Sequence, residues 1–295
     1  MHQTTHDQQI VYLNGQFMPM ADSKISTQDR GFLFGDGVYE VIPVYNTKLF
    51  SFKEHLQRLK KSLRAVSIEN PLSDQEWLTL LNSLIAKHPW QDQYIYLQVT
   101  RGIHMQRDHL PADHLIPTIY AYTNPLKPVA QNIIENGIKI ITLEDIRWLN
   151  CDIKAITLLP NVMMKLAAKA QGADDAILVS REGLVTEGTA SNAFMVKDDT
   201  IFTPPNGKEI LPGITRLVIE RIAKAHNIPL IEQDITETML SDADEIWLSS
   251  STKEALPVTL LNRNPVGTGK PGTIWHKINR FYHEYKHDFI RRQAT

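Results

Sequence analysis

Polar and apolar residues alternate in short runs through the first fifty residues, which predicts β-strands joined by tight turns. Residues 9–20 read QIVYLNGQFMPM, and the Asn-Gly pair in the middle supplies the positive φ angles of a two-residue hairpin turn. Residues 37–52 repeat this pattern around an Asn-Thr pair. Pro43 interrupts the second run and has no backbone N–H to donate. We therefore expect it at a sheet edge, at a bulge, or where the N–H of the strand would face away from the neighbouring strand.

Apolar residues then recur every three or four positions, which is the spacing of an amphipathic helix. This spacing predicts helices over residues 52–68 and 73–88, and a serine and glutamate three apart form a capping box at the start of the second. Residues 94–100 and 118–123 return to a strand-like composition. The sequence therefore predicts a smaller α+β domain over residues 1–123.

Residues 124–132 contain two prolines and little periodicity, so we expect an interdomain linker there. Strand and helix patterns alternate again over residues 133–295, which predicts a second, larger domain. Its strands are expected over residues 137–144, 175–188, 191–205, 228–235 and 245–250, and its helices over residues 160–173, 216–226 and 237–244. The fold class expected for the whole chain is a two-domain mixture of α+β and α/β.

Composition and charge narrow the class of protein without identifying it. The 295 residues carry 31 Lys plus Arg against 33 Asp plus Glu, so no basic excess indicates a nucleic-acid partner. The single cysteine, Cys151, cannot form an intramolecular disulfide. No window approaches the ~18 consecutive apolar residues of a membrane span, and the polar N-terminus lacks the apolar core of a signal peptide. We therefore expect a cytoplasmic protein without a membrane or nucleic-acid partner.

One lysine stands in the mostly apolar run WLNCDIKAITLLP, residues 148–160. Burial would cost Lys154 its hydration unless the amine reached water, paired with a carboxylate or lost its proton. One explanation is a side chain whose stem packs while its ammonium group reaches solvent. The other is a buried amine, free to form an imine with a carbonyl compound.

Two turns have the composition of anion-binding sites. Gly213, Ile214 and Thr215 stand at the start of a predicted helix, whose free N–H groups and positive dipole end suit a phosphate. Thr215 acting as an ordinary helix cap explains the same pattern. Residues 249–252, SSST, follow a buried-looking strand and also suit an anion, although such turns are common. The two turns become informative only if the fold brings them together.

Three further side chains are candidates for charge recognition. Glu187 lies on an apolar strand, where a carboxylate requires a cationic partner, and a structural ion pair with an arginine would meet that requirement. Arg107 and His109 are two apart in a loop, so an extended backbone would aim both to one side, although many such pairs are merely solvated. An amine, an anion site and a carboxylate together are what a pyridoxal-phosphate enzyme needs.

Seven sequence blocks resemble, in their order, the fold-type IV (class IV) pyridoxal-phosphate-dependent aminotransferases. The blocks span about residues 10–265 and read RGFLFGDGVYEV, EHLQRL, VTRG, EDIRWLNCDIK, VTEGTASNAF, LPGITR and SSSTKEALPV. Within this family the chain most resembles the bacterial D-amino-acid aminotransferases. The branched-chain aminotransferases, which act on L-amino acids, and the aminodeoxychorismate lyases usually lack the Arg107-x-His109 pair.

The resemblance implies a role for each matching residue. Lys154 matches the Schiff-base lysine, which also moves the substrate proton, and Glu187 matches the carboxylate that pairs with the pyridine nitrogen. The other cofactor contacts that it implies are Arg58 on the phosphate, Leu211 on the ring, and Ile214, Thr215 and Ser251 at the two phosphate turns. The residues that it implies for the substrate carboxylate are Tyr39, Arg107 and His109. The larger C-terminal domain would carry Lys154 and most of the cofactor contacts.

The resemblance also implies a reaction and an assembly. The reaction is transamination between a D-amino acid such as D-alanine and a 2-oxo acid such as 2-oxoglutarate or pyruvate, by a homodimer with residues of both subunits around each site. Ala190 departs from the family, because D-specific enzymes often carry serine there, and this puts the tuning of the cofactor in doubt. Alternatives are an L-branched-chain aminotransferase, an aminodeoxychorismate lyase, and a non-catalytic protein that binds carbonyl compounds or phosphate.

Overall fold

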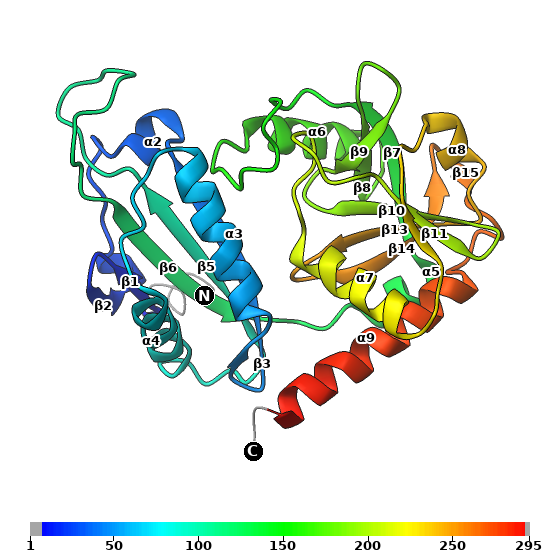
Figure 1. Cartoon of the computed structure of the whole chain (residues 1–295), viewed down its shortest axis with the longest axis horizontal. Coiled ribbons are helices and arrows are strands. Elements are labelled where there is room, and N and C mark those ends of the chain that lie inside the picture. The colour runs from blue at the N-terminus through cyan, green and yellow to red at the C-terminus, as the bar shows by residue number, and fades with distance from the viewer. Residues whose placement is uncertain (1–7, 293–295) are drawn as a thin grey trace. The chain divides into compact units, whose positions relative to one another are not determined.

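A computed structural model describes residues 8–292 and divides the chain into two compact units, each built on its own β-sheet (Figure 1). Within the described chain, unit 1 comprises residues 8–127 together with residues 153–157. Unit 2 comprises residues 128–152 and 158–292. Both units combine helices with sheets, which confirms the predicted mixed fold class. No helix within residues 8–292 is long and apolar enough to cross a membrane.

Unit 1 contains a six-stranded sheet in the order β2-β1-β6-β5-β3-β4. Its strands are β1 (Ile10–Leu13), β2 (Gln16–Pro19), β3 (Gly37–Tyr45), β4 (Lys48–Leu49), β5 (Gln93–Thr100) and β6 (Thr118–Pro125). All of the pairings are antiparallel. Both predicted hairpins are confirmed, and Asn14 and Gly15 have the positive φ angles that the first turn requires.

Pro43 lies inside β3, which is next to the edge of the sheet. The carbonyl oxygen of Pro43 accepts a hydrogen bond from Phe50 N–H (2.9 Å), on the side of the two-residue strand β4. The N–H and C=O of one strand residue point to the same side, so the missing proline N–H costs β3 no hydrogen bond to β5. A proline is therefore tolerated at this position of the sheet.

Two helices share one core with alternate residues of β3 and β5 (Figure 1). α3 (Phe52–Ala65) buries three leucines, and α4 (Asp74–Ile85) buries Trp77 completely. A fully buried leucine contributes roughly 1.5–3 kcal/mol to folding. The capping box at the start of α4 is confirmed, since Glu76 N–H donates to Ser73 Oγ and Ser73 N–H donates to the Glu76 carboxylate.

Two short elements of unit 1 lie outside the prediction: η1 (Met20–Asp22) and α2 (Arg30–Phe34). Asp29 caps α2 by accepting a hydrogen bond from Gly31 N–H (2.8 Å). Gly35 ends the helix in the left-handed conformation, with φ of 68°, which glycine adopts without steric cost. A helix of this length is too short to show a hydrophobic period, and so it escapes a search for one.

Residues 153–157 pack with unit 1, although we expected them in the larger C-terminal domain. Tyr39 N–H donates a hydrogen bond to Lys154 O (2.9 Å), and Ile156 N–H donates one to Gly37 O (3.1 Å). These bonds place the segment beside the first residues of β3, where β4 does not reach. Lys154 therefore belongs to unit 1, because backbone pairing with a strand distant in sequence decides its place.

Unit 2 contains a nine-stranded mixed sheet in the order β12-β11-β10-β13-β14-β7-β8-β9, with β15 also paired to β14. Its strands are β7 (Ile138–Glu144), β8 (Asp175–Val179), β9 (Val185–Gly188), β10 (Asn192–Lys197), β11 (Thr200–Thr203), β12 (Leu230–Glu232), β13 (Glu245–Ser250), β14 (Glu254–Leu261) and β15 (Asn264–Pro265). The β7–β8, β7–β14 and β11–β12 pairs are parallel.

The helices of unit 2 are α5 (Gln131–Asn136), α6 (Leu159–Ala170), α7 (Ile214–Ala225), α8 (Glu237–Ser241) and α9 (Thr273–Arg292). The sequence did not predict α9, which packs against α7 (Figure 1). The buried carboxylate of Glu245 fixes its start, because it accepts hydrogen bonds from the N–H groups of Ile274 and Trp275 (2.8 Å each). α5 begins within the stretch that we expected to be a linker.

Candidate active site

The backbone of Lys154 is held on both sides, while its amine has few contacts. Lys154 N–H donates to Ser62 Oγ of α3 (3.2 Å), and Lys154 O accepts from Tyr39 N–H (2.9 Å). Lys154 Nζ lies 4.2 Å from the centroid of the Tyr39 ring, a cation–π contact. No described residue forms a hydrogen bond or ion pair with this amine. The side chain is half-buried, which lies between the two explanations that the sequence left open.

The run around Lys154 is less buried than its composition predicts. Cys151 and Ala155 are buried, but Trp148, Leu149 and Leu159 are exposed. Composition cannot distinguish an apolar run that enters a core from one that forms an apolar surface. Backbone hydrogen bonds, rather than burial of the whole run, therefore set the position of Lys154.

Tyr39 belongs to a row of aromatic rings across β3, β5 and β6. Its ring stacks on Tyr96 with centroids 5.7 Å apart, and Tyr96 stacks on Tyr122 at 5.1 Å. Burial raises the pKa of the Tyr96 hydroxyl well above its ordinary value, so the middle ring of the row stays neutral. The stacking holds the Tyr39 ring in place beneath the Lys154 amine.

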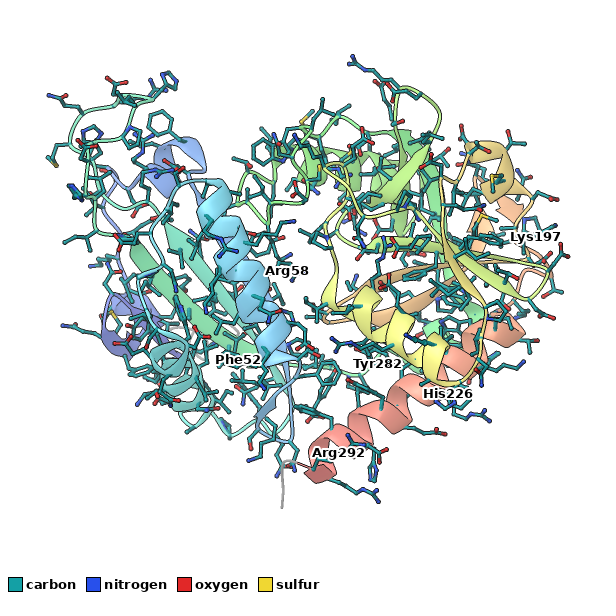
Figure 2. All side chains as sticks on the ribbon, in the orientation of Figure 1. Phe52, Arg58, Lys197, His226, Tyr282 and Arg292 are labelled. Carbon is teal, nitrogen blue, oxygen red and sulfur yellow. The ribbon has the colours of Figure 1, made fainter. Side chains whose placement is uncertain are left out.

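Arg58 lies on α3 (Figure 2). Its side chain is part of a buried charge cluster. Its Nε and Nη2 each donate to a Glu40 oxygen at 2.8 Å, and His55 Nδ1 lies 2.8 Å from Glu40 Oε2. Burial acts to raise the pKa of Glu40, but the Arg58 charge and the hydrogen bonds from Arg58 and His55 lower it to about 2. Burial lowers the pKa of His55, so that ring is neutral, and its Nε2 has no hydrogen-bond partner among the described residues. Arg58 is therefore not a solvated surface residue.

Glu187 lies buried on β9, with both carboxylate oxygens engaged. Arg147 Nη1 donates to Oε1, and Asn192 Nδ2 (3.1 Å) and Leu211 N–H (3.2 Å) donate to Oε2. Arg147 is itself held by Asp145, to which its Nε and Nη2 donate at 2.9 and 2.6 Å. The ion pair keeps Glu187 ionised, and an ionised carboxylate can also pair with a protonated pyridine nitrogen. The structural ion pair that the sequence left open is thus present.

Arg147 is the site residue that the sequence reasoning did not identify. It stands in the block EDIRWLNCDIK and is almost completely buried. Burial acts against its charge, but hydrogen bonds to Asp145 and the charge of Glu187 raise the pKa of Arg147. The need of Glu187 for a cation predicted some arginine. Nothing in the sequence says which one, because the pair joins residues forty positions apart.

The start of α7 presents N–H groups that no side chain caps. Gly213 is the N-cap, and Thr215 is the second residue of the helix, so the alternative of Thr215 as the cap is wrong. Ile214 and Thr215 are both buried. A Cβ atom at Gly213 would lie 1.9 Å from Asn192 Oδ1, so this approach of the helix start to β10 requires glycine. Free N–H groups at a helix start suit a phosphate.

The second turn lies beside the first within unit 2. Asn192 of β10 is opposite Ser249 of β13 in the sheet, and Asn192 Nδ2 donates to Leu211 O (2.8 Å), two residues before Gly213. The Ser249 hydroxyl is buried without a hydrogen-bond partner in the described part of the chain, and the half-buried Ser251 follows it. An uncapped helix start and an unpartnered hydroxyl on one side of a sheet fit an anion such as phosphate.

Arg107 and His109 lie in an exposed loop over residues 101–117, between β5 and β6. The Arg107 guanidinium lies 5.2 Å from the centroid of the Phe34 ring, and the His109 ring centroid is 5.5 Å from the same ring. The structure thus brings the pair together on one aromatic residue of α2. Within residues 8–292, no hydrogen bond, ion pair or ring contact joins either of them to Tyr39.

The candidate residues therefore form two groups that are each defined inside one unit. Unit 1 holds Lys154, Tyr39, Arg58 and the Arg107-x-His109 pair, and unit 2 holds Glu187 with the two phosphate-type turns. No cluster of three or more His, Cys, Asp or Glu side chains in the described chain could bind a metal ion. An amine, a fixed carboxylate and an anion site are together the groups that hold pyridoxal phosphate.

Known proteins show extensive similarity to this chain. A D-alanine aminotransferase of Staphylococcus aureus (strain COL) is 40% identical over 275 residues, which cover 93% of this chain and 97% of that protein. A D-alanine aminotransferase of Bacillus licheniformis is 41% identical over 269 residues, covering 91% of this chain and 94% of that protein. Both alignments span nearly the whole of each protein, so the similarity is not confined to one unit.

Solved structures show the same fold. A branched-chain amino acid aminotransferase from Escherichia coli superposes with a TM-score of 0.88 at 25% identity, covering 92% of this chain and 93% of that one. The branched-chain aminotransferase of the archaeon Thermoproteus uzoniensis with norvaline gives a TM-score of 0.85 at 25% identity, covering 93% of each chain. Residues 37–261 match the model of the family described as amino-transferase class IV. The chain belongs to the class IV aminotransferases, as the order of its sequence blocks predicted.

Proposed function

We propose that this protein is a D-amino-acid transaminase that moves the amino group of a D-amino acid, such as D-alanine, to 2-oxoglutarate or pyruvate. Class IV aminotransferases depend on pyridoxal 5′-phosphate, which is therefore the cofactor. The D-alanine aminotransferase of Staphylococcus aureus shares 40% identity with the chain, whereas the branched-chain aminotransferases of Escherichia coli and Thermoproteus uzoniensis share 25%. One observation carries the proposed chemistry: the backbone of Lys154 is fixed by hydrogen bonds, while its amine has no ion-pair partner among residues 8–292.

Lys154 and Glu187 carry the central roles. When bound, pyridoxal phosphate supplies an aldehyde that receives the amino group and a pyridine ring that takes up electron density from the substrate α-carbon. Lys154 Nζ holds the cofactor aldehyde and, once released, takes the proton from the α-carbon as a general base. Glu187, which Arg147 keeps ionised, holds a proton on the pyridine nitrogen.

Cofactor binding uses groups whose charge or polarity the fold has already fixed. The free N–H groups at Ile214 and Thr215 and the positive end of α7 bind the phosphate, together with Ser251. Arg58 adds a positive charge whose orientation Glu40 sets through two hydrogen bonds. Leu211 packs against the cofactor ring. Its N–H already donates to Glu187, so its main chain is fixed.

Substrate recognition depends on the α-carboxylate. Arg107 supplies positive charge, Arg107 and His109 both supply N–H donors, and Tyr39 supplies a hydroxyl donor. A planar guanidinium can bind both oxygens of a carboxylate at once, which fixes the orientation of the α-carbon. The presence of the Arg-x-His pair in the chain supports a D-amino-acid substrate over the L-specific relatives.

We also propose that the protein is a homodimer. α6 leaves Leu159, Val162, Met163 and Leu166 between 51% and 69% exposed, and their spacing places all four on one face of the helix. A continuous apolar face of this kind marks an interaction surface. Leu166→Glu should therefore produce monomers, which light scattering coupled to gel filtration would detect. A wild-type protein that is monomeric at micromolar concentration would contradict this proposal.

A cytoplasmic location stays a prediction from sequence.

Substrate assays separate the proposal from its alternatives. Purified protein supplied with pyridoxal phosphate is assayed with D-alanine and with L-leucine, each with 2-oxoglutarate, and aminodeoxychorismate is tested for pyruvate release. We expect amino transfer from D-alanine at the highest kcat/KM. Preference for L-leucine or release of pyruvate from aminodeoxychorismate would assign one of the family alternatives. A colourless protein without amino transfer would indicate a binding protein instead.

A further inference from the structure

The side chain of Arg30 connects α2 to the loop over residues 101–117. Arg30 Nη1 donates to the carbonyl oxygen of Asp108 (2.6 Å), and Arg30 Nη2 donates to that of His109 (2.9 Å). Arg30 is only 4% exposed, although the loop residues that it holds are exposed. One buried guanidinium therefore fixes the two peptide groups on either side of His109.

A second interaction fixes the guanidinium of Arg30 itself. Arg30 Nε donates to Asp36 Oδ2 (2.8 Å), and Arg101 donates to the same carboxylate through Nε (2.8 Å) and Nη2 (2.9 Å). Burial acts to raise the pKa of Asp36, but the hydrogen bonds from Arg101 and Arg30 hold it below its ordinary value, so the carboxylate is ionised. A planar guanidinium held at Nε can aim its two other nitrogens in only one direction.

Phe34, at the end of α2, contacts the side chains of the pair. Its ring centroid lies 4.7 Å from the Arg30 guanidinium, 5.2 Å from that of Arg107 and 5.5 Å from the ring of His109. In the described part of the chain, Arg107 forms no hydrogen bond or ion pair, so this cation–π contact is what orients its side chain. The same ring limits the positions open to His109.

The start of the loop is attached to the residues around α2 as well. Arg30 N–H donates to Gly102 O (2.9 Å), and His104 N–H donates to Gln28 O (3.2 Å). Gly102 has a φ of 96°, and a Cβ atom there would lie 1.9 Å from Ile116 O, so the two ends of the loop meet closely. Loops of this length without regular structure are uncommon, and many of them serve binding or catalysis.

We infer that Arg30 and Phe34 are positioning residues for the substrate α-carboxylate, which they do not touch themselves. Arg30 sets the backbone on both sides of His109, directly beyond Arg107, and Phe34 sets the directions of the two side chains. A loop that is ordered in advance spares the substrate the entropy of ordering it, so selectivity for carboxylate-bearing amines depends on α2. The inference rests on the proposed role of the Arg107-x-His109 pair.

The test compares two amines that differ in the carboxylate alone. kcat/KM is measured for D-alanine and for ethylamine, with 2-oxoglutarate as acceptor, in the holoenzyme and in Arg30→Lys. Lysine keeps the charge but cannot hold Asp36 and both carbonyl groups at once. We expect the ratio of kcat/KM for D-alanine over that for ethylamine to fall roughly tenfold, since charge-assisted hydrogen bonds are lost. The fall should be mainly in KM for D-alanine, with the ethylamine rate almost unchanged.

Arg101→Lys is the matched control. Arg101 shares Asp36 with Arg30, but its other donors reach the carbonyl oxygens of Val66 and Ser67 rather than the Arg107-x-His109 segment. It should lower the unfolding midpoint about as much as Arg30→Lys does but lower the substrate ratio clearly less, because Arg30 still holds both carbonyl groups of the Arg107-x-His109 segment. Phe34→Leu keeps an apolar side chain but removes the aromatic face, and it should lower the ratio roughly 2- to 5-fold.

Two results would overturn the inference. Equal losses on both amines in Arg30→Lys, or an equal fall of the ratio in Arg101→Lys, would show that the cluster merely supports the fold. If Arg30→Lys does not fold, an unchanged ratio in Phe34→Leu is sufficient to reject it. Failure of the proposed function is seen separately, because wild-type enzyme that does not prefer D-alanine over ethylamine would reject the carboxylate role before any variant is compared.

Discussion

Lys154 in unit 1 and Glu187 in unit 2 differ in how many partners the fold gives them. The Lys154 amine has one aromatic contact and no ion pair among the described residues, whereas Glu187 accepts from an arginine, an asparagine and a main-chain N–H. A group that must exchange partners during a reaction cannot be held by strong ones. A group that must keep one charge throughout is best held by several. We therefore expect the Lys154 amine to change partners during the reaction and Glu187 to keep its partners and its charge.

Removing the mobile amine gives the largest expected effect. Lys154→Ala should lower the rate of amino transfer from D-alanine at least about 1000-fold, because it removes both the attachment of the cofactor and the general base, and proton transfer alone contributes about 10²–10⁴. Stopped-flow measurement of a single turnover would detect this loss.

The control for Lys154 is Lys165→Ala on α6, since the Lys165 amine is already paired with Asp175 (2.7 Å) and should be dispensable. Near-wild-type turnover by Lys154→Ala would show that the reactive amine is not that of Lys154.

Changing the fixed charge should give the next largest effect. Glu187→Gln removes the negative charge beside the pyridine nitrogen. An opposite charge shifts a pKa by about 1–3, so kcat should fall roughly 10- to 1000-fold. KM for D-alanine should change little, because the proposed role of Glu187 is to contact the cofactor rather than the substrate. Steady-state kinetics would separate the two quantities, with the exposed Glu182→Gln as control. A loss confined to cofactor affinity would return Glu187 to a purely structural role.

Unit 1 has its own permanent carboxylate in Glu40, which provides a test by pH. Its pKa of about 2 in the fold lies below the ordinary 4.5, so its stabilisation is fully present above about pH 4.5 and is lost as the pH falls towards 2. The contribution is on the order of 3 kcal/mol. Urea unfolding at pH 6 and pH 3 should show a smaller loss of stability in Glu40→Gln than in wild type. Equal losses would mean that Glu40 is not held ionised by Arg58.

A smaller loss of activity than at Lys154 or Glu187 is expected at Arg107, whose side chain has a cation–π contact with Phe34 and no ion pair within residues 8–292. Arg107→Ala should lower kcat/KM for D-alanine roughly 10- to 150-fold, since a hydrogen bond to a charged group contributes about 1.5–3 kcal/mol. The loss for ethylamine should be much smaller, because that amine has no carboxylate. Equal losses on both substrates would indicate damage to the fold or to the cofactor site.

Local patterns were sufficient for most elements of the fold. The hairpins of β1–β2 and β3–β4 and the helices α3 and α4 were predicted because their signals lie within a few neighbouring residues. The long helix α9 was not predicted. Its buried positions are sparse among charged and histidine residues, and the Glu245 carboxylate that fixes its start lies far back in the sequence.

Candidate site residues could be predicted where the chemistry requires one residue type. They could not be predicted where contacts between distant residues set the position or the partner of a side chain. Chemistry and motif order were sufficient to select Lys154 and Glu187 as candidates. The partner of Glu187, the place of Lys154 in unit 1 and the attachment of Arg107 to α2 depend on contacts between distant residues. Lys154 shows the limit most plainly. Its apolar neighbours predicted burial, whereas main-chain hydrogen bonds position it and several of those neighbours are exposed.

The order of synthesis gives residues 153–157 a further significance. When residue 127 leaves the ribosome, one side of β3 at Gly37–Tyr39 has no neighbouring segment, because that segment has not yet been made. An unpaired strand edge can bind other chains, so the nascent protein is open to wrong pairing until residue 157 emerges. The same segment brings Lys154. The pairing of this strand edge and the arrival of the amine that we propose as reactive are therefore one event in synthesis.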